Sequence, residues 1–254
     1  MEQLNKIALI TGGSRGLGKN AAIHLAKKGI NVIITYQSKE AEANETVGIL
    51  KEMGVNAAAL QLDVAKSDTF DRFLSDTASL LKAEFNVTKL DYLVNNAGIG
   101  IHTPFAETTE DQFDTLVKIQ FKGPFFLTQK ALPLLNDGGG IINISSGLAR
   151  FSLPGYATYA AMKGAMETLT KYQAKELGSR GIRVNIIAPG AIETDFGGGA
   201  VRDNADLNAV IASQTALGRV GLPDDIGGVV AFLCTEEARW INGQRIEASG
   251  GMFL

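Results

Sequence analysis

The residues of this chain best suited to chemistry lie between Ser146 and Lys163. Tyr159 and Lys163 are four positions apart, a spacing that places both side chains on one face of a helix. A tyrosine hydroxyl has an ordinary pKa of about 10 and is a poor acid near neutral pH. A neighbouring ammonium group and a helix N-terminus both favour the phenolate, and a pKa of about 7 would require on the order of 4 kcal/mol. The pattern indicates proton transfer, although on its own it is also typical of a solvated helix pair.

The rest of the sequence alternates short apolar runs with amphipathic segments, as strands and helices do. Strands are predicted at 7–10, 31–36, 55–62, 90–94, 141–145 and 183–188. A helix over 111–135 is expected to be kinked at Gly123 and Pro124, and another covers 156–177. The alternation predicts one α/β domain over residues 1–254, with a doubly wound Rossmann-type parallel sheet of about seven strands and helices on both faces.

Composition limits the kinds of protein that the chain can be. It has 254 residues, is 45% hydrophobic and carries a net charge of −3, so no electrostatic attraction to nucleic acid or an anionic membrane is expected. One cysteine, Cys234, excludes an internal disulfide, and the histidines His24 and His102 form no metal-binding cluster with it. No signal peptide precedes the first strand, and no apolar run approaches the ~20 residues of a membrane span. We expect a cytoplasmic protein without a metal.

A glycine-rich loop follows the first predicted strand. It reads Gly12-Gly-Ser-Arg-Gly-Leu-Gly18 and opens a helix that extends to Lys28. Between a strand and a helix, such a loop lets the backbone approach a pyrophosphate, which the N–H groups of the helix N-terminus bind. Taken alone, the loop is equally typical of a tight turn, so it indicates a dinucleotide site only in combination with other features.

The end of the second predicted strand bears on the choice of coenzyme. Sites that select NAD usually carry an acidic residue there, which binds the ribose 2′-hydroxyl. Here Tyr36, Gln37 and Ser38 stand at that place, so no carboxylate would repel a 2′-phosphate. Arg15, with Ser38 and Lys39, has the charge to bind one, which favours NADP(H) over the alternative, NAD(H). In the other interpretation, Arg15 and Lys39 are solvated surface charges.

Taken together, the motifs resemble those of one family. The chain contains, in order, Thr11-Gly-x-x-x-Gly-x-Gly18, Asn95-Asn-Ala-Gly98, Ser146, Tyr159-x-x-x-Lys163 and Pro189-Gly190. This set is similar to that of the short-chain dehydrogenases/reductases, in their single-domain branch, and the likeness extends over essentially the whole chain. The resemblance implies an NAD(P)(H)-dependent oxidoreductase that interconverts a ketone or aldehyde and an alcohol by hydride transfer.

The resemblance also implies a role for each residue. Tyr159 would give a proton to the substrate oxygen as hydride leaves the nicotinamide, Lys163 would lower its pKa and bind the nicotinamide ribose, and Ser146 would hold the carbonyl oxygen. Where the family usually has a catalytic asparagine, this chain has Gln120, and we expect the proton relay to survive with altered local packing. A larger set of residues is expected around the coenzyme. These are Gly12, Ser14, Arg15, Gly16, Leu17, Gly18, Tyr36, Gln37, Ser38, Asp63, Val64, Asn95, Ala97, Gly98, Tyr159, Lys163, Pro189, Gly190, Ile192 and Thr194.

The expectations for Asp63, for a lid and for the substrate pocket rest on fewer residues. Asp63 would accept a hydrogen bond from an adenine amine, or else cap the next helix. A lid over residues 190–215 would hinge at the three glycines 197–199. The pocket is expected to be mostly apolar, which suits an apolar ketone or its alcohol. Its candidate residues are Ile101, Leu148, Phe151, Tyr156 and Phe196.

Alternatives to a small-molecule ketone reductase stay open. The motifs also resemble 3-oxoacyl-[acyl-carrier-protein] reductases, but the turn expected at 135–139 carries Asp137, which would repel an acidic carrier, although Arg180 stands at a second basic position. The spacing of Tyr156 and Lys163 resembles that of enoyl reductases, whereas the glycine loop and the serine–tyrosine pair favour carbonyl chemistry. A cofactor-sensing protein without turnover, or a structural subunit, would have no need of a proton donor.

The helix predicted at 156–177 is apolar or small on more than one face. The residues in question are Ala157, Ala161, Ala165, Met166, Leu169 and Tyr172. A second subunit would cover such a surface, and the resemblance implies a homotetramer.

Overall fold

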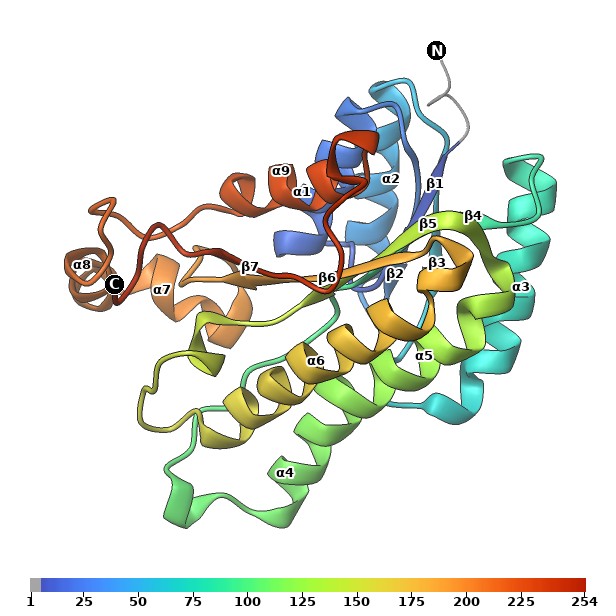
Figure 1. Cartoon of the computed structure of the whole chain (residues 1–254). Coiled ribbons are helices and arrows are strands. Elements are labelled where there is room, and N and C mark those ends of the chain that lie inside the picture. Colours follow the sequence, from blue (N-terminus) through green and yellow to red (C-terminus); the bar gives the residue numbers. More distant parts are fainter. Residues whose placement is uncertain (1–5) are drawn as a thin grey trace.

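A seven-stranded parallel sheet forms the centre of the protein (Figure 1). The computed structural model describes residues 6–254, so the expectations about the N-terminal segment fall on residues 1–5, outside the described residues. The strands are β1 (Ile7–Ile10), β2 (Asn31–Tyr36), β3 (Ala57–Gln61), β4 (Leu90–Asn95), β5 (Leu135–Ile144), β6 (Arg183–Pro189) and β7 (Arg245–Ala248). Their order is β3-β2-β1-β4-β5-β6-β7, and every neighbouring pair is parallel. The predicted Rossmann-type α/β fold is confirmed.

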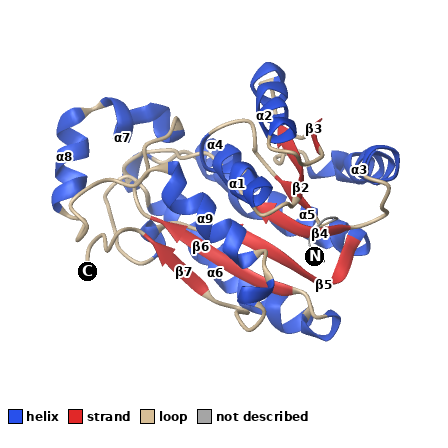
Figure 2. Cartoon of the chain, turned by 90° about the horizontal axis from the view of Figure 1, so that it is seen from above, coloured by secondary structure: helices blue, strands red, loops and turns tan. Residues whose placement is uncertain are grey.

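Helices cover both faces of the sheet (Figures 1 and 2). They are α1 (Gly16–Lys27), α2 (Glu40–Glu52), α3 (Phe70–Glu84), α4 (Glu110–Val117), α5 (Gly123–Ala131), α6 (Ala157–Glu176), α7 (Ala200–Asp203), α8 (Ala205–Ser213) and α9 (Pro223–Leu233). Because side chains alternate along a strand, Ala8 and Ile10 of β1 pack in one core with α1, α2 and α9. Ile7 and Leu9 pack in the opposite core with α3, α5 and α6. This double burial explains why the strands read as continuous apolar runs.

The long helix predicted over 111–135 is composite. Between α4 and α5 lies a π-helical segment, Lys118–Lys122. Pro124 has no N–H to donate to the carbonyl of Gln120, so the α-helical pattern cannot run through this point. The N–H of Gly123 bonds instead to the carbonyl of Lys118, five residues back. The irregularity predicted at Gly123 and Pro124 therefore takes the form of a π-helical segment that includes Gln120.

The strand β5 begins at Leu135 rather than at residue 141 as predicted. The sequence Asn136-Asp-Gly-Gly139 has low strand propensity, yet β5 pairs with β4 through a register shift between Leu90 and Tyr92, as in a bulge. Residues 135–139, expected to be a turn, therefore belong to the sheet.

The carboxyl ends of the parallel strands meet at one edge of the sheet. From β1 the chain builds outward to β2 and β3, and it then returns to build from β4 to β7 on the other side. Ligands of such sheets bind outside this edge, next to the point where the order reverses, here between β1 and β4. Within residues 6–254, no group of His, Cys, Asp and Glu side chains is arranged to hold a metal ion. None of the described helices is long and apolar enough to cross a membrane.

Candidate active site

The helix α6 places Tyr159 and Lys163 on its buried face. The buried residues of this helix are Tyr159, Lys163, Met166, Thr170 and Ala174, and steps of three and four define one helical face. Only 6% of Tyr159 and 5% of Lys163 is exposed. The amine of Lys163 lies 5.5 Å from the centroid of the Tyr159 ring. It donates a hydrogen bond of 2.8 Å to the carbonyl of Ile144, at the end of β5.

Burial dominates the acid–base properties of this pair. It raises the pKa of Tyr159 above its ordinary value, which outweighs the opposing effect of a hydrogen bond with Ser146. Burial also lowers the pKa of the Lys163 amine to about 7, because the charged form loses its hydration. Lys163 is not among the causes of the raised pKa of Tyr159, and the expectation that it lowers this pKa stays a prediction. The amine is directed at a backbone carbonyl, and the phenol keeps its proton at neutral pH.

Ser146 stands directly beyond β5, as predicted. Its backbone is extended, and a short helical turn, Gly147–Ala149, follows it. The hydroxyl oxygen of Ser146 accepts a hydrogen bond of 3.2 Å from the N–H of Leu148 in this turn. The preceding hydroxyl, that of Ser145, points elsewhere and donates to Glu167 over 2.6 Å. The two neighbouring serines at the end of β5 thus have different surroundings. Ser146 is adjacent to Tyr159, and Ser145 ties β5 to α6.

Gln120 lies inside the π-helical segment and is 2% exposed. Its amide nitrogen donates to the carbonyl of Ile99, and its buried oxygen, Oε1, has no partner among the described residues. A Cβ atom at Gly98 would lie only 2.9 Å from the amide nitrogen. The longer side chain is accommodated because residue 98 has none, which is the altered packing that the sequence predicts.

Replacing Gln120 with asparagine is expected to change turnover by less than about tenfold, which corresponds to about 1.4 kcal/mol in the barrier. It should lower the free energy of unfolding by about 1 kcal/mol, because one buried methylene group is lost. Steady-state kinetics and urea unfolding would measure both. A gain in turnover of about 100-fold would show instead that the glutamine impairs the site.

The turn between β1 and α1 is too closely packed for side chains at two of its glycines. Gly12 has a φ of +67°, and a Cβ atom there would lie 3.0 Å from the Cα of Ala97. A Cβ atom at Gly18 would lie 2.2 Å from the carbonyl oxygen of Gly12. The amide of Asn96 donates to the carbonyls of Thr11 and Gly12, which fixes the turn against the end of β4.

The N-terminus of α1 fits the pyrophosphate of a dinucleotide. Its N-cap residue, Arg15, makes no capping hydrogen bond through its side chain, and the first turn contains no acidic residue. The first N–H groups of the helix therefore remain available to an anion, which the helix dipole also favours. Gly16 faces Thr194, whose side chain would be 3.8 Å from a Cβ atom at this glycine, so the loop and the segment after β6 lie opposite each other.

The other residues predicted around the coenzyme all follow, or end, strands at the same edge of the sheet. They are Tyr36, Gln37 and Ser38 at β2, Asp63 and Val64 at β3, Asn95, Ala97 and Gly98 at β4, and Pro189, Gly190, Ile192 and Thr194 at β6. Ser14 and Leu17 belong to the turn and first residues of α1. The topology thus gathers residues that are up to 182 positions apart, Gly12 and Thr194, along one line.

Two of these side chains, Asn95 and Asp63, make hydrogen bonds within the protein. The amide of Asn95 donates to Thr128 of α5 and to Asn143 of β5, over 2.9 and 2.8 Å, so it holds β4 to its neighbours rather than lining the groove. Asp63 accepts from the N–H of Ala65 over 3.0 Å. It closes a local turn and does not cap the helical turn that begins at Ser67, and its contact with an adenine amine stays a prediction.

The two cations predicted to bind a 2′-phosphate both have acidic neighbours. Arg15 lies 3.6 Å from Asp195, and Lys39 lies 3.4 Å from Glu42. These pairs are solvent-exposed, and pairs of this kind contribute about 0.2–1 kcal/mol. These ion pairs therefore hold Arg15 and Lys39 only weakly, and their binding of a 2′-phosphate stays a prediction.

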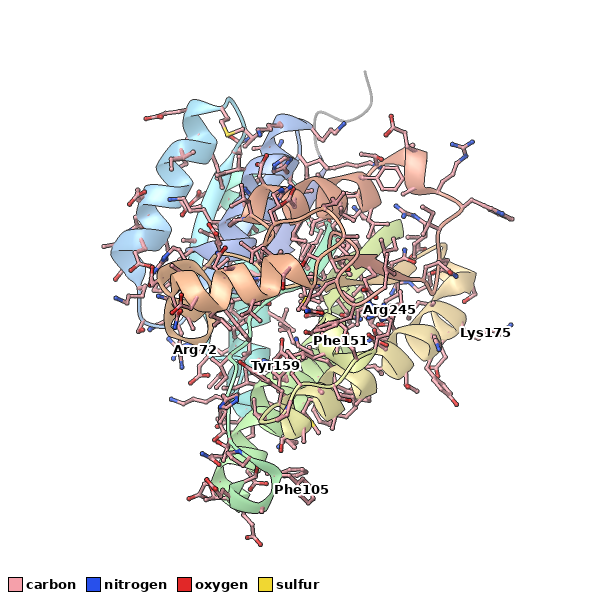
Figure 3. The ribbon with its side chains drawn as sticks, turned by 90° about the vertical axis from the view of Figure 1, so that its left-hand side faces the viewer. Arg72, Phe105, Phe151, Tyr159, Lys175 and Arg245 are labelled. Carbon is pink, nitrogen blue, oxygen red and sulfur yellow. The ribbon has the colours of Figure 1, made fainter. Side chains whose placement is uncertain are left out.

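Aromatic side chains surround Tyr159, near the centre of the view in Figure 3. The ring of Phe196 is 5.8 Å from that of Tyr159, and the ring of Tyr156 is 6.4 Å away. His102, which the sequence did not place in the pocket, packs edge-on against Tyr156 at 5.0 Å. Phe151 contacts Phe253 instead, with ring centroids 4.6 Å apart. No sequence pattern signals that last contact, because the residues are far apart in the chain.

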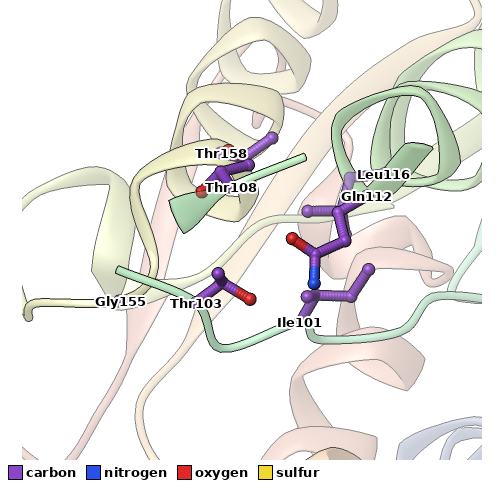
Figure 4. A pocket seen from close by; sticks show the side chains of 7 residues that line it. All are labelled: Ile101, Thr103, Thr108, Gln112, Leu116, Gly155 and Thr158. Carbon is purple, nitrogen blue, oxygen red and sulfur yellow. The ribbon is translucent and has the colours of Figure 1, made fainter. Parts of the chain in front are cut away.

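Ile101 lines a small cavity, which Figure 4 shows from close by. Its remaining lining residues are Thr103, Thr108, Gln112, Leu116, Gly155 and Thr158. The cavity is lined by none of the predicted catalytic residues.

The segment predicted to be a lid contains Phe196, whose ring lies beside Tyr159. The three residues Gly197–Gly199 have φ values from +62° to +80°, a region that disfavours other residues. Phe196, just before them, lies against Gly100, where a Cβ atom would be 2.7 Å from the ring. The absence of a side chain at residue 100 thus makes room for Phe196. The hinge itself stays a prediction.

Comparisons with known proteins agree with this geometry. A family model described as enoyl-(acyl carrier protein) reductase matches residues 12–253. The 3-oxoacyl-[acyl-carrier-protein] reductase FabG of Staphylococcus aureus is 38% identical over 254 residues, which cover 99% of this chain and 100% of that protein.

Solved structures are equally similar over their full lengths. LugOII, described as a promiscuous reductase that catalyses a keto-reduction during lugdunomycin biosynthesis, has a TM-score of 0.94 and 39% identity, with 100% of both chains covered. The angucycline ketoreductase LanV, solved with NADP, has a TM-score of 0.93 and 36% identity, over 99% of this chain and 97% of that chain.

The fold and the residues at the edge of the sheet define an NAD(P)-dependent oxidoreductase. Within that class, the chain belongs to the short-chain dehydrogenase/reductase family.

Proposed function

We propose that this protein reduces the carbonyl group of a small, largely apolar ketone to an alcohol with NADP(H). The observation that carries the proposal is the placement of Tyr159 and Lys163 on the buried face of α6, with the Lys163 amine 5.5 Å from the Tyr159 ring and bonded to the end of β5. Because burial raises the pKa of Tyr159, its hydroxyl is protonated at neutral pH, as a donor to a carbonyl oxygen must be. A raised pKa also makes the hydroxyl a weaker acid, so it would give up its proton only as negative charge develops on the carbonyl oxygen.

The residues at the edge of the sheet would each have a separate role in the reaction. When bound, the coenzyme supplies the hydride that adds to the carbonyl carbon. Ser146 would donate a hydrogen bond to the carbonyl oxygen, and Tyr159 would transfer its proton to that oxygen as the negative charge develops. Lys163, with a pKa of about 7, would be able to hold or release a proton near the site. The free N–H groups of α1 would bind the pyrophosphate.

A panel of ketones, supplied with NADPH or NADH, tests the function. We expect NADPH to be oxidised with at least one apolar ketone. Tight binding of the coenzyme without oxidation by any ketone would point instead to a cofactor-sensing protein. The panel should include an enoyl thioester, because the matching family model is described as an enoyl reductase and Tyr156 lies beside Tyr159.

A 3-oxoacyl thioester on its carrier protein is the second candidate substrate. The relative from Staphylococcus aureus is named for that activity. In this chain, however, the guanidinium of Arg180 is bound by Asp137 at 2.7 Å and by the carbonyls of Leu132 and Leu135. Its charge is therefore partly neutralised where a carrier would need it. Faster turnover of the carrier-bound substrate than of free ketones would favour this second function.

NADPH is expected to be used more efficiently than NADH, and Arg15→Ala should remove most of the difference. A charge-assisted hydrogen bond contributes about 1.5–3 kcal/mol, so the KM for NADPH should rise by about 10- to 100-fold, while that for NADH changes little. The matched control is Arg72→Ala, which removes an exposed arginine of α3 that is 3.9 Å from Asp76. A preference for NADH in the unaltered protein would contradict the role of Arg15.

A homotetrameric assembly and a cytoplasmic location are further proposals for this protein. A homotetramer would cover Tyr172 and Phe105, which are 65% and 85% exposed. Met166, expected on the same surface, is a core residue with 2% exposure. Mass measurement in solution tests the assembly, and the cytoplasmic location stays a prediction.

A further inference from the structure

Four charged side chains lie behind the catalytic loop and are not explained by the proposed chemistry. They are Arg150, Glu167, Arg245 and Glu247, called here the Arg150 cluster. They come from the loop after β5, from α6 and from β7, so they join three elements that approach one another only in the folded protein. Figure 3 shows Phe151, next to Arg150, between Tyr159 and Arg245 in that view.

One end of the cluster ties the strand that leads to Ser146 to the helix that carries Lys163. Glu167, one turn beyond Lys163 on α6, accepts hydrogen bonds of 2.6 Å from Ser145 and from Nε of Arg245. A second nitrogen of Arg245 lies 3.5 Å from the carbonyl oxygen of Ser146. The two catalytic segments are thus fixed relative to each other at a point outside the reacting groups.

The other end holds the C-terminal residues against the pocket. Arg150 binds both oxygens of Glu247, over 2.6 and 2.7 Å, and donates to the carbonyls of Met252 and Phe253, over 2.7 and 3.1 Å. The ring of Phe253 then packs on Phe151, one of the residues predicted to line the pocket. A forked guanidinium matches this set of four acceptors, which lysine could not bind in the same way.

The C-terminal residues are held in a conformation that needs such support. Phe253 has a φ of +53°, which costs on the order of 1 kcal/mol or more for a residue other than glycine. Besides Arg150, the carbonyl of Gln214 fixes it, by accepting from its N–H over 3.0 Å. Gln214 follows α8, so the same residues also connect the catalytic loop to the end of the predicted lid.

The cluster is balanced in charge, with two arginines and two glutamates. The hydrogen bonds from Arg150 are the main reason why the pKa of Glu247 is lowered to about 2. The Glu247 carboxylate therefore stays charged over the pH range of ordinary assays. Because the forked side of Arg150 is fully used by protein acceptors, the cluster is not suited to bind an anionic substrate.

We infer that the Arg150 cluster positions the segment Ser146–Phe151 and thereby sets the affinity of the enzyme for its carbonyl substrate. Arg150 and Glu247 act through Phe151 and Ser146 and touch no reacting atom, so they are positioning residues. The consequence for substrate affinity rests on the proposed function, whereas the ordering of the segment does not.

The test compares Arg150→Met with Arg180→Met. Arg180 is a matched control, because it too binds one carboxylate and two backbone carbonyls, but it does so at the opposite end of the sheet. In Arg150→Met, the KM for the ketone should rise by about tenfold, with kcat within about threefold and the Kd of NADPH within about twofold of the unaltered protein. Arg180→Met should change none of the three by more than about twofold.

Hydrogen exchange provides a readout that does not depend on activity. The N–H groups of Ala149, Arg150 and Phe151 are bonded within the turn after Ser146. Their exchange should accelerate by about tenfold or more in Arg150→Met, which corresponds to a loss of about 1.4 kcal/mol of local protection. If the unaltered protein reduces no ketone but this acceleration is seen, the proposed function fails and the positioning role stands.

Two further variants keep the inference open to refutation if Arg150→Met does not fold. Phe253→Ala leaves the ion pair of Arg150 and Glu247 in place and should also raise the KM for the ketone. Glu247→Gln should have the same effects as Arg150→Met. In the double variant Arg150→Met/Glu247→Gln, the effects should be less than additive. An unchanged KM and unchanged exchange in folded Arg150→Met, or equal changes in Arg180→Met, would overturn the inference.

Discussion

Replacing Tyr159 with phenylalanine is expected to lower kcat for ketone reduction by about 10²- to 10⁴-fold, the usual contribution of a positioned acid. The substitution removes the hydroxyl and keeps the ring that packs beside Phe196 and Tyr156. The Kd of NADPH, measured by fluorescence titration, should therefore stay within about threefold. Loss of turnover with retained coenzyme binding would locate the defect in proton transfer.

Two other tyrosines make this prediction specific. Tyr172 lies on the same helix and is 65% exposed, so Tyr172→Phe should leave kcat unchanged. Tyr156 has the spacing that resembles enoyl reductases, and Tyr156→Phe should affect mainly the KM of the substrate. If Tyr156→Phe abolished turnover and Tyr159→Phe did not, the proton donor would be Tyr156, and the proposed carbonyl chemistry would lose its central residue.

The sequence predicts most of the sheet because β1, β2, β4 and β6 are largely buried and read as apolar runs, whereas β7 is half-buried, reads Arg-Ile-Glu-Ala and is not among the predicted strands. It fails at the beginning of β5, where Asn136-Asp-Gly-Gly139 has no strand signal. These residues are drawn into the sheet by pairing with β4, across the irregularity at Leu90 and Tyr92. Tertiary pairing overrides local propensity there, and no local pattern could have shown it.

The candidate site likewise has features that the sequence predicts and features that it does not. Local spacing places Ser146, Tyr159 and Lys163 near one another, because strand ends and helix turns are local features. The pKa values of Tyr159 and Lys163 depend on what covers them, which is a property of the whole fold. The pairing of Arg150 with Glu247, 97 positions apart, could likewise not be predicted, since many other acids and bases were available as partners.

The burial of Lys163 leads to the second large expected effect. Its pKa in the folded protein is about 7, against 10.5 for an ordinary lysine. Between these values the unfolded chain binds more protons than the folded protein at this residue, so stability should rise with pH by up to about 1.4 kcal/mol per pH unit. Lys163→Met keeps an unbranched side chain of similar length without a charge, and should remove this rise.

Urea unfolding without coenzyme at pH 7.5 and 9.5 measures the effect. Over this interval the unaltered protein should gain on the order of 2 kcal/mol relative to Lys163→Met. Lys171→Met, on the exposed side of the same helix, should keep the pH dependence of the unaltered protein. In a separate assay of ketone reduction with NADPH, kcat of Lys163→Met should fall by about 100-fold or more, as for loss of a group in the proton-transfer site.

The two readouts separate the roles of the amine. A flattened pH dependence with retained turnover would mean that Lys163 is a buried structural residue, and that Tyr159 and Ser146 suffice for proton transfer. Lost turnover with an unchanged pH dependence would mean that the amine is charged and solvated in the folded protein, so burial could not be what sets its pKa. Only the joint loss fits an amine that is held by the carbonyl of Ile144 and passes a proton from solvent to the Tyr159 phenolate that ketone reduction would leave.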